Sequence, residues 1–163
     1  MIKAPKILKT ESKIAACIHL NIPRKAIQDE MKPAIDELIS VLSDQGNPPI
    51  GPMFAHHLTQ SSTHFDFEVG FPVASPISAV GRVENSELPA ATIAQTTYQG
   101  PYEGLYAAWE EFGKMLENNE IIQKEGLKRG ETLWEVYVLG PEKNENPATW
   151  RTDLCLPLVS AIS

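Results

Sequence analysis

The apolar positions of this chain alternate between strand spacing and helix spacing, and they do so in the same order twice. In the first half, an apolar strand-like run precedes a helix that begins near Pro23, and two further strands follow. Pro33 lies inside this helix, so we expect a kink or a restart there, because proline removes one backbone hydrogen bond. The helix has its apolar stripe at Ile27, Met31, Ile35, Leu38 and Leu42, and the strands are predicted at Ile14–Leu20, Met53–Leu58 and Phe65–Val73, with a polar turn at Thr59–Thr63.

The second half repeats this order. Its helix starts at Gly100-Pro101, with proline in the favoured first turn, and extends to about Asn118. One stripe of the helix is apolar and predicts the core face, and an adjacent stripe is aromatic. The core stripe consists of Leu105, Ala108, Phe112 and Met115, the aromatic stripe of Tyr102, Tyr106 and Trp109, and the strands are predicted at Thr92–Tyr98, Leu133–Leu139 and Thr152–Leu158.

A strand-helix-strand-strand order that occurs twice predicts an α+β fold. One copy alone would leave a sheet edge and a sheet face unprotected, so we expect the copies to pair into one antiparallel sheet with both long helices on one side. Residues 1–163 then form a single domain with pseudo-repeats at about 12–74 and 90–159. The connector Ser75–Pro89 is expected to contain a short strand near Ala79–Val83. Ligand pockets often lie at such a junction, which predicts a central ligand cleft.

Glu135 is the one carboxylate in the apolar run Leu133–Leu139. Strand side chains alternate between two faces, so Glu135 and Tyr137 are predicted to project the same way. An unpaired buried carboxylate costs several kcal/mol, and it therefore needs a partner, a proton or a wet cavity that a ligand can fill. The alternative is a glutamate at a strand edge that reaches solvent.

The charge pattern narrows the classes of partner. The formal net charge is −7 at pH 7, and the basic residues are scattered. Nucleic-acid binding needs clustered lysine and arginine, so it is not expected, whereas cationic or neutral small molecules are favoured. No apolar run approaches the length of a membrane span, and the first residues lack the apolar core of a signal peptide. We therefore expect a cytoplasmic protein without membrane contact.

The histidines do not predict a metal site. His56 and His57 are adjacent in a predicted strand, so they point to opposite faces and cannot bind one metal together. His19 and His64 have no cysteine or carboxylate at metal-ligand spacing. We predict neither a metal nor a cofactor.

Several motifs, taken in their order and spacing, resemble the GyrI-like small-molecule-binding domain, which also follows DNA-binding modules in AraC-type and MerR-type multidrug-sensing regulators. The resemblance extends from Ile14 to Leu158. In the second half it rests on Tyr98-Gln99-Gly100-Pro101-Tyr102-Glu103-Gly104-Leu105, Trp134-Glu135-Val136-Tyr137, Gly140-Pro141, Trp150-Arg151-Thr152-Asp153-Leu154 and Leu156-Pro157-Leu158, and in the first half on Gly51-Pro52-Met53-Phe54 and Phe67-Glu68-Val69-Gly70-Phe71-Pro72-Val73.

The resemblance implies two strand-helix-strand-strand modules with a cleft for bulky, often cationic, aromatic compounds. The family's pocket acid corresponds to Glu135, and a second pocket position corresponds to Tyr137. His57 stands where many relatives have tyrosine, which could change ligand preference or provide a titrating partner for Glu135. The helix-borne aromatics correspond loosely to Tyr102, Tyr106 and Trp109, for which ordinary core packing is the alternative.

Three functions follow from the residues and the resemblance. The first is a stand-alone protein that binds a hydrophobic, cationic aromatic compound. The second is a hydrolase of cyclopropanoid DNA-alkylating compounds, with Glu135 as general base and Tyr137 steadying the developing charge. The third is an inhibitor of DNA gyrase, as for the family's namesake. No helix-turn-helix is predicted, because all helical segments belong to the binding domain.

Overall fold

The structure is a computed structural model that describes residues 2–60 and 63–160. The chain divides into two compact units. We call Glu11–Ala90 the N-terminal unit, and Met1–Thr10 together with Ala91–Ser163 the C-terminal unit. Each unit contains an antiparallel sheet and a long helix, and each is described by itself.

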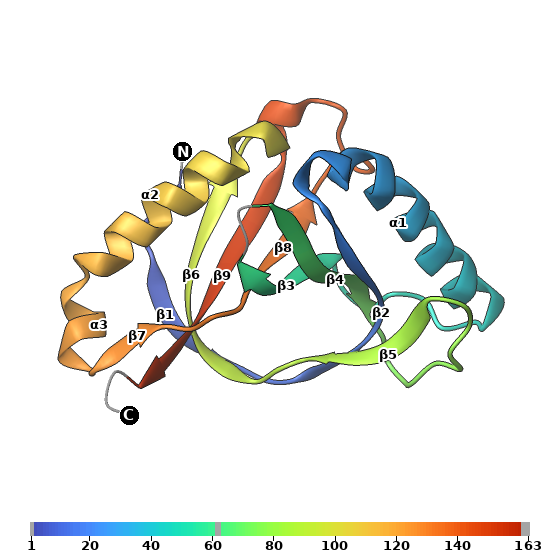
Figure 1. Cartoon of the computed structure of the whole chain (residues 1–163), viewed down its shortest axis with the longest axis horizontal. Helices are drawn as coiled ribbons and strands as arrows, with labels where there is room; N and C mark the ends of the chain where they lie inside the picture. Colours follow the sequence, from blue (N-terminus) through green and yellow to red (C-terminus); the bar gives the residue numbers. More distant parts are fainter. Residues whose placement is uncertain (1, 61–62, 161–163) are drawn as a thin grey trace. The chain divides into compact units, whose positions relative to one another are not determined.

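The N-terminal unit has four antiparallel strands in the order β3-β4-β2-β5. Its long helix contacts β2, β4 and β5 (Figure 1). The helix buries Ala34, Leu38, Val41 and Leu42, which recur at helical spacing. The elements are β2 (Lys13–Pro23), η1 (Arg24–Ala26), α1 (Ile27–Asp44), β3 (Phe54–Gln60), β4 (His64–Pro72) and β5 (Val83–Leu88).

The C-terminal unit has the corresponding strand order β1-β6-β9-β8, and a short strand, β7, pairs with the end of β9. All of these pairings are antiparallel. The elements are β1 (Lys6–Thr10), β6 (Ala91–Gln99), η2 (Tyr102–Gly104), α2 (Leu105–Glu117), α3 (Glu120–Lys124), β7 (Leu127–Arg129), β8 (Leu133–Leu139), η3 (Pro147–Thr149) and β9 (Arg151–Ser160).

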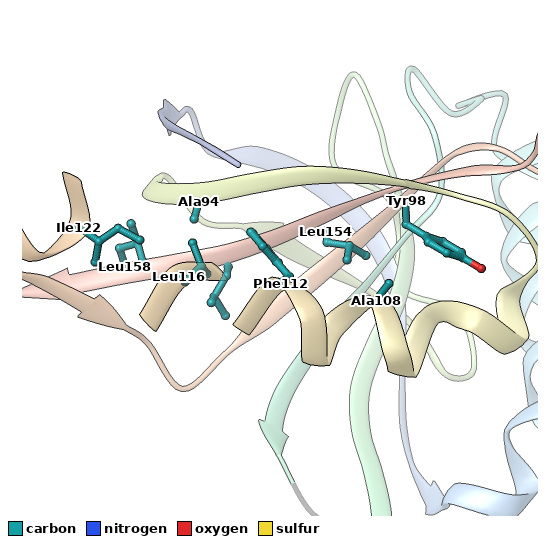
Figure 2. Close-up of a cluster of buried hydrophobic side chains, with 9 residues drawn as sticks. Ala94, Tyr98, Ala108, Phe112, Leu116, Ile122, Leu154 and Leu158 are labelled. Atoms are coloured by element: carbon teal, nitrogen blue, oxygen red, sulfur yellow. The ribbon is translucent and has the colours of Figure 1, made fainter. Parts of the chain in front are cut away.

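The core of the C-terminal unit lies between α2 and the strands β6 and β9 (Figure 2). Ala108, Phe112 and Leu116 form the buried stripe of α2. The predicted stripe included Met115, but Leu116 is the buried residue, since it follows Phe112 by four positions and lies on the same helix face. The opposing strands contribute Ala94, Tyr98, Leu154, Leu156 and Leu158, and α3 contributes Ile122.

The α+β class with antiparallel strands and two long helices is confirmed. The predicted β8 agrees with the observed strand at both ends. The helix around Pro33 is continuous, so the expected restart does not occur. The connector strand was placed too early: it spans Val83–Leu88, because Val80 and Val83 pair across a turn in which Gly81 has a φ of +57°.

Two strands and one α-helix have no counterpart in the sequence prediction. They are β1, β7 and α3, each only three to five residues long. Segments of this length contain too few periods to reveal a buried face. The expected turn at Thr59–Thr63 includes Ser61 and Ser62, which lie outside the described residues.

Candidate functional site

Glu135 lies in the middle of β8, opposite Leu154 of β9. Its side chain is buried, with a residue exposure of 8%. Apart from Trp134, the remaining residues of β8 are more open, with Val138 37% exposed, but Glu135 does not reach solvent as the strand-edge alternative required. A carboxylate in this position requires polar partners.

Two neutral side chains donate hydrogen bonds to the Glu135 carboxylate. The Trp109 indole Nε1–H of α2 donates to Oε2 at 2.7 Å, and the Tyr137 hydroxyl donates to Oε1 at 2.8 Å. The second bond follows from strand geometry, since residues two apart project from the same face. Of the ion pairs among the described residues, none involves Glu135. The carboxylate is thus solvated by the protein without a compensating positive charge.

Tyr137 is fitted to act as a donor. Burial, followed by the charge of Glu135 and the hydrogen bond to it, holds the pKa of the Tyr137 hydroxyl well above its ordinary value of 10. The hydroxyl therefore keeps its proton at neutral pH and points it at the carboxylate.

Tyr102 extends this cluster through ring contacts. Its ring meets Tyr137 edge-on, with centroids 5.8 Å apart, and lies 4.8 Å from the ring of Trp150 in a tilted arrangement. Burial, followed by the charges of Glu142 and Glu135, raises the pKa of Tyr102 to about 12. Aromatic pairs at these separations contribute about 0.5–1.5 kcal/mol beyond their buried area.

The turn before α2 requires glycine at two positions, Gly100 and Gly104. The Tyr98 hydroxyl donates to the carbonyl of Pro101 at 2.7 Å. A Cβ on Gly104 would lie 2.0 Å from that hydroxyl oxygen, and Gly100 has a φ of +145°, which favours glycine. This turn places Tyr102 at the start of η2. Some residues of the motif that resembles the family therefore form the turn that positions Tyr102.

The predicted site residues are not all brought together. Glu135, Tyr137 and Trp109 are joined by hydrogen bonds, and Tyr102 joins them through Tyr137. Tyr106 is 67% exposed and has no ring contact or hydrogen bond to them in the described part of the chain.

His57 belongs to the N-terminal unit, where its ring stacks on Phe67 at 5.1 Å and meets Phe65 edge-on at 5.7 Å. A pairing of His57 with Glu135 stays a prediction.

Trp150 is a site residue that the sequence analysis did not single out. It immediately precedes β9, and its indole N–H donates to the carbonyl of Asn144 at 2.8 Å. The available signal was its place in a motif close to the strand that pairs with Tyr137. Within residues 2–60 and 63–160, no three histidine, cysteine or carboxylate side chains are grouped as metal ligands. No described helix is long and apolar enough to cross a membrane.

The chain belongs to the family of the GyrI-like small molecule binding domain, whose model matches residues 3–159. It is accordingly a small-molecule-binding domain. A comparison with curated proteins gives no match.

Several solved structures share the fold. The EcmrR C-terminal domain aligns with a TM-score of 0.75 at 17% identity, over 96% of this chain and 97% of that one. The present chain spans 58% of the EcmrR chain in its complex with DNA. SAV2435 bound to tetraphenylphosphonium has a TM-score of 0.68 at 10% identity, with 95% and 93% covered. A hydrolase from Listeria innocua has a TM-score of 0.62 at 14% identity, with 95% and 91% covered.

Proposed function

We propose that this domain binds bulky lipophilic cations with aromatic groups and that Glu135 is the acid that recognises their charge. The observation that carries the proposal is the state of the Glu135 carboxylate. It is buried, both of its oxygens accept hydrogen bonds, and both donors are neutral. Neither donor carries a positive charge, so the hydrogen bonds leave the negative charge of the carboxylate for a cationic ligand to compensate.

The magnitudes favour a cation at this position. At an effective dielectric constant of about 20, two opposite unit charges about 5 Å apart attract by roughly 3 kcal/mol. The rings of Tyr102, Tyr137 and Trp150 lie in the same cluster. Aromatic faces add about 0.5–2 kcal/mol for each cation–π contact, and their area favours bulky apolar substituents. The carboxylate attracts the cationic group of a ligand, and the aromatic rings bind its apolar groups. A site of this kind can bind ligands with different scaffolds.

The solved structures support this choice of ligand. SAV2435, which shares the fold at 10% identity, is described as bound to tetraphenylphosphonium, a lipophilic aromatic cation.

Calorimetric titration with two isosteric ions of opposite charge tests the proposal. Tetraphenylphosphonium should bind the wild type, and tetraphenylborate, which has the same shape, should bind much more weakly. Glu135→Gln keeps the volume and removes the charge, so it should weaken phosphonium binding by about 1–3 kcal/mol. Glu131→Gln removes an exposed carboxylate near the start of β8 and should change affinity little. Equal phosphonium affinity in the wild type and Glu135→Gln would show that the acid is structural.

Hydrolysis of a cyclopropanoid compound is a second candidate. The observation that favours it is the hydrogen bond between the Tyr137 hydroxyl and Glu135, which places a donor beside a base. A carboxylate oxygen that accepts one hydrogen bond retains a lone pair for a water molecule. Glu135 would take a proton from that water, the water oxygen would bond to a ring carbon, and the ring C–C bond would break with its electron pair passing to the activating carbonyl of the substrate. Tyr137 would stabilise the resulting oxyanion, and the proton held by Glu135 would return to the opened product, which completes the addition of one water.

Product analysis separates catalysis from binding. With an activated cyclopropane substrate, mass spectrometry should detect a product heavier by one water in the wild type. Glu135→Gln should abolish this product, and Tyr137→Phe should reduce its rate by about 10-fold or more, as expected for the loss of one oxyanion donor. Turnover at the wild-type rate in Glu135→Gln would exclude this mechanism. Inhibition of DNA gyrase stays a prediction without an assigned surface.

A further inference from the structure

A second carboxylate lies beside the aromatic cluster, at the turn that follows β8. A Cβ on Gly140 would meet the Tyr102 hydroxyl oxygen at 2.8 Å and the nearer carboxylate oxygen of Glu142 at 2.9 Å. The Tyr102 hydroxyl and the Glu142 carboxylate therefore converge on the same point of the backbone. Glycine at position 140 permits this approach, since any side chain there would displace both groups.

Glu142 is held near Tyr102 by the architecture of its turn. The backbone N–H groups of Lys143 and Asn144 donate to the carbonyl of Gly140 at 3.1 and 3.2 Å. The indole of Trp150 donates to the carbonyl of Asn144 at 2.8 Å. The ring that packs on Tyr102 thus also anchors the turn that presents Glu142.

The charge of Glu142 is available to a ligand. Glu142 is an exposed residue, and no ion pair in the described part of the chain includes it. Tyr102 lies within the field of both Glu142 and Glu135, and both charges contribute to the raised pKa of its hydroxyl. Through the Tyr102–Tyr137 ring contact and the Tyr137–Glu135 hydrogen bond, the cluster runs from an exposed carboxylate to a buried one.

We propose that Glu142 is a specificity-determining residue that gives the site a preference for aromatic ligands with two separated cationic groups. The proposal rests on the proposed function. One cationic group would meet the buried Glu135, and the second would meet Glu142 beside Tyr102, with apolar parts against the intervening rings. A ligand with a single charge would use Glu135 alone.

The two carboxylates differ in their response to salt. Exposed charge pairs are screened over about 10 Å at 0.1 M salt and about 3 Å at 1 M, whereas buried pairs are screened much less. The contribution of Glu142 should therefore disappear at high salt, while that of Glu135 persists. The salt dependence of binding therefore distinguishes the contributions of Glu142 and Glu135.

The test compares butyltriphenylphosphonium, which has one charge, with butane-1,4-diyl-bis(triphenylphosphonium), which has two. At low salt, Glu142→Gln should weaken binding of the bis-phosphonium by about fivefold, the upper range for an exposed ion pair, and leave the mono-phosphonium within about twofold. At 1 M NaCl the effect on the bis-phosphonium should vanish. The matched control is Glu145→Gln, which removes the same charge from another exposed position in the loop and should leave both affinities within about twofold.

The outcomes separate this inference from the proposed function. It is overturned if Glu142→Gln leaves bis-phosphonium affinity unchanged, weakens both probes equally, or matches Glu145→Gln. Glu135→Gln is measured in the same series and should weaken both probes at both salt concentrations. If Glu135→Gln has no effect on either probe, the proposed function fails whatever the result for Glu142.

Discussion

The two units place different chemistry on equivalent backbone positions. The strand pairing β8–β9 shifts register after Tyr137, and the pairing β3–β4 shifts register after His57. Aligning these two β-bulges makes His57 the counterpart of Tyr137 and Ala55 the counterpart of Glu135. Ala55 is buried, with an exposure of 1%. Only the C-terminal unit therefore has an acid at this position.

The same alignment extends to the turn before each helix. Arg24 becomes the counterpart of Tyr102, and Phe65 the counterpart of Trp150. The guanidinium of Arg24 lies 4.6 Å from the centre of the Phe65 ring, and the Tyr102 ring lies 4.8 Å from that of Trp150. In the N-terminal unit the aromatic ring already receives a cation from the protein itself. In the C-terminal unit the equivalent contact is neutral and the acid lies nearby.

This difference indicates how a duplicated fold acquires one binding site. The backbone, the bulge and the helix entry are retained in both units, because they are set by strand pairing and turn geometry. Ligand chemistry depends on a few substitutions at those positions. In the C-terminal unit, an acid with neutral donors favours a cationic ligand. In the N-terminal unit, the aromatic ring already has a cation–π contact with an arginine of the protein.

The comparison predicts its largest effect for Ala55→Glu. In the N-terminal unit, the counterparts of the two donors are Met31, which has no N–H or O–H group in its side chain, and His57. A carboxylate at position 55 would be buried without a counterpart of the Trp109 indole donor, and the ring of His57 could supply at most one N–H. We therefore expect a loss of about 3–5 kcal/mol in the free energy of unfolding, measured by urea denaturation. Ala55→Gln controls for size. A Glu variant as stable as the Gln variant would contradict the prediction.

Gly104→Ala should cost about 2–3 kcal/mol, the usual scale for forcing atoms into a filled site. Its Cβ would lie 2.0 Å from the Tyr98 hydroxyl oxygen. The counterparts in the N-terminal unit are Ala26 and Leu20, and leucine has no hydroxyl to clash with an alanine. Adding Tyr98→Phe to Gly104→Ala should recover part of the loss in a denaturation experiment. If the double variant loses more free energy of unfolding than the two single variants lose together, this contact is contradicted.

Trp109→Phe should reduce the free energy of unfolding by about 1–3 kcal/mol, because it leaves one oxygen of the buried Glu135 without its donor. In the double variant with Glu135→Gln, the penalty should shrink, since no buried charge remains. A double-mutant cycle measured by chemical denaturation checks this coupling. Strictly additive effects would mean that the indole contributes packing alone.

Raising the pH above 10 should lower the free energy of unfolding, because the buried tyrosines lose their protons. Burial is the main cause that raises the pKa values of Tyr98, Tyr102 and Tyr137 above 10 in the folded state. A raised folded pKa favours the protonated form, so this stabilisation is complete below pH 10 and is lost as the pH rises from 10 through about 12 for Tyr102.

Tyr137→Phe removes one of these groups. Above pH 10 its free energy of unfolding should fall less steeply than that of the wild type, by about 1.4 kcal/mol per pH unit, one proton's contribution. Denaturation curves collected between pH 9 and about 11 measure the slopes, and this range ends below the pKa of about 12 for Tyr102. Parallel curves for the two proteins would show that Tyr137 ionises normally.

The repeated order of elements and the apolar character of β8 can be predicted from the sequence alone. Period-two alternation placed Glu135 and Tyr137 on one face, and their hydrogen bond bears this out. The helical spacing in the sequence also indicates that Tyr106 is exposed. That residue precedes Phe112 by six positions, so at about 100° per residue it lies roughly 120° around the helix from the core face.

Contacts between side chains that are distant in the sequence depend on the packing of the whole fold. Trp109 reaches Glu135 across 26 positions of sequence, and Trp150 packs on Tyr102 from the turn before β9. The periodicity of apolar residues shows which face of one helix or strand is buried. It does not show which other element that face meets, because this depends on how the whole core packs. The acid and its neighbour Tyr137 could therefore be identified from the sequence, whereas the contact with Trp109 required the three-dimensional structure.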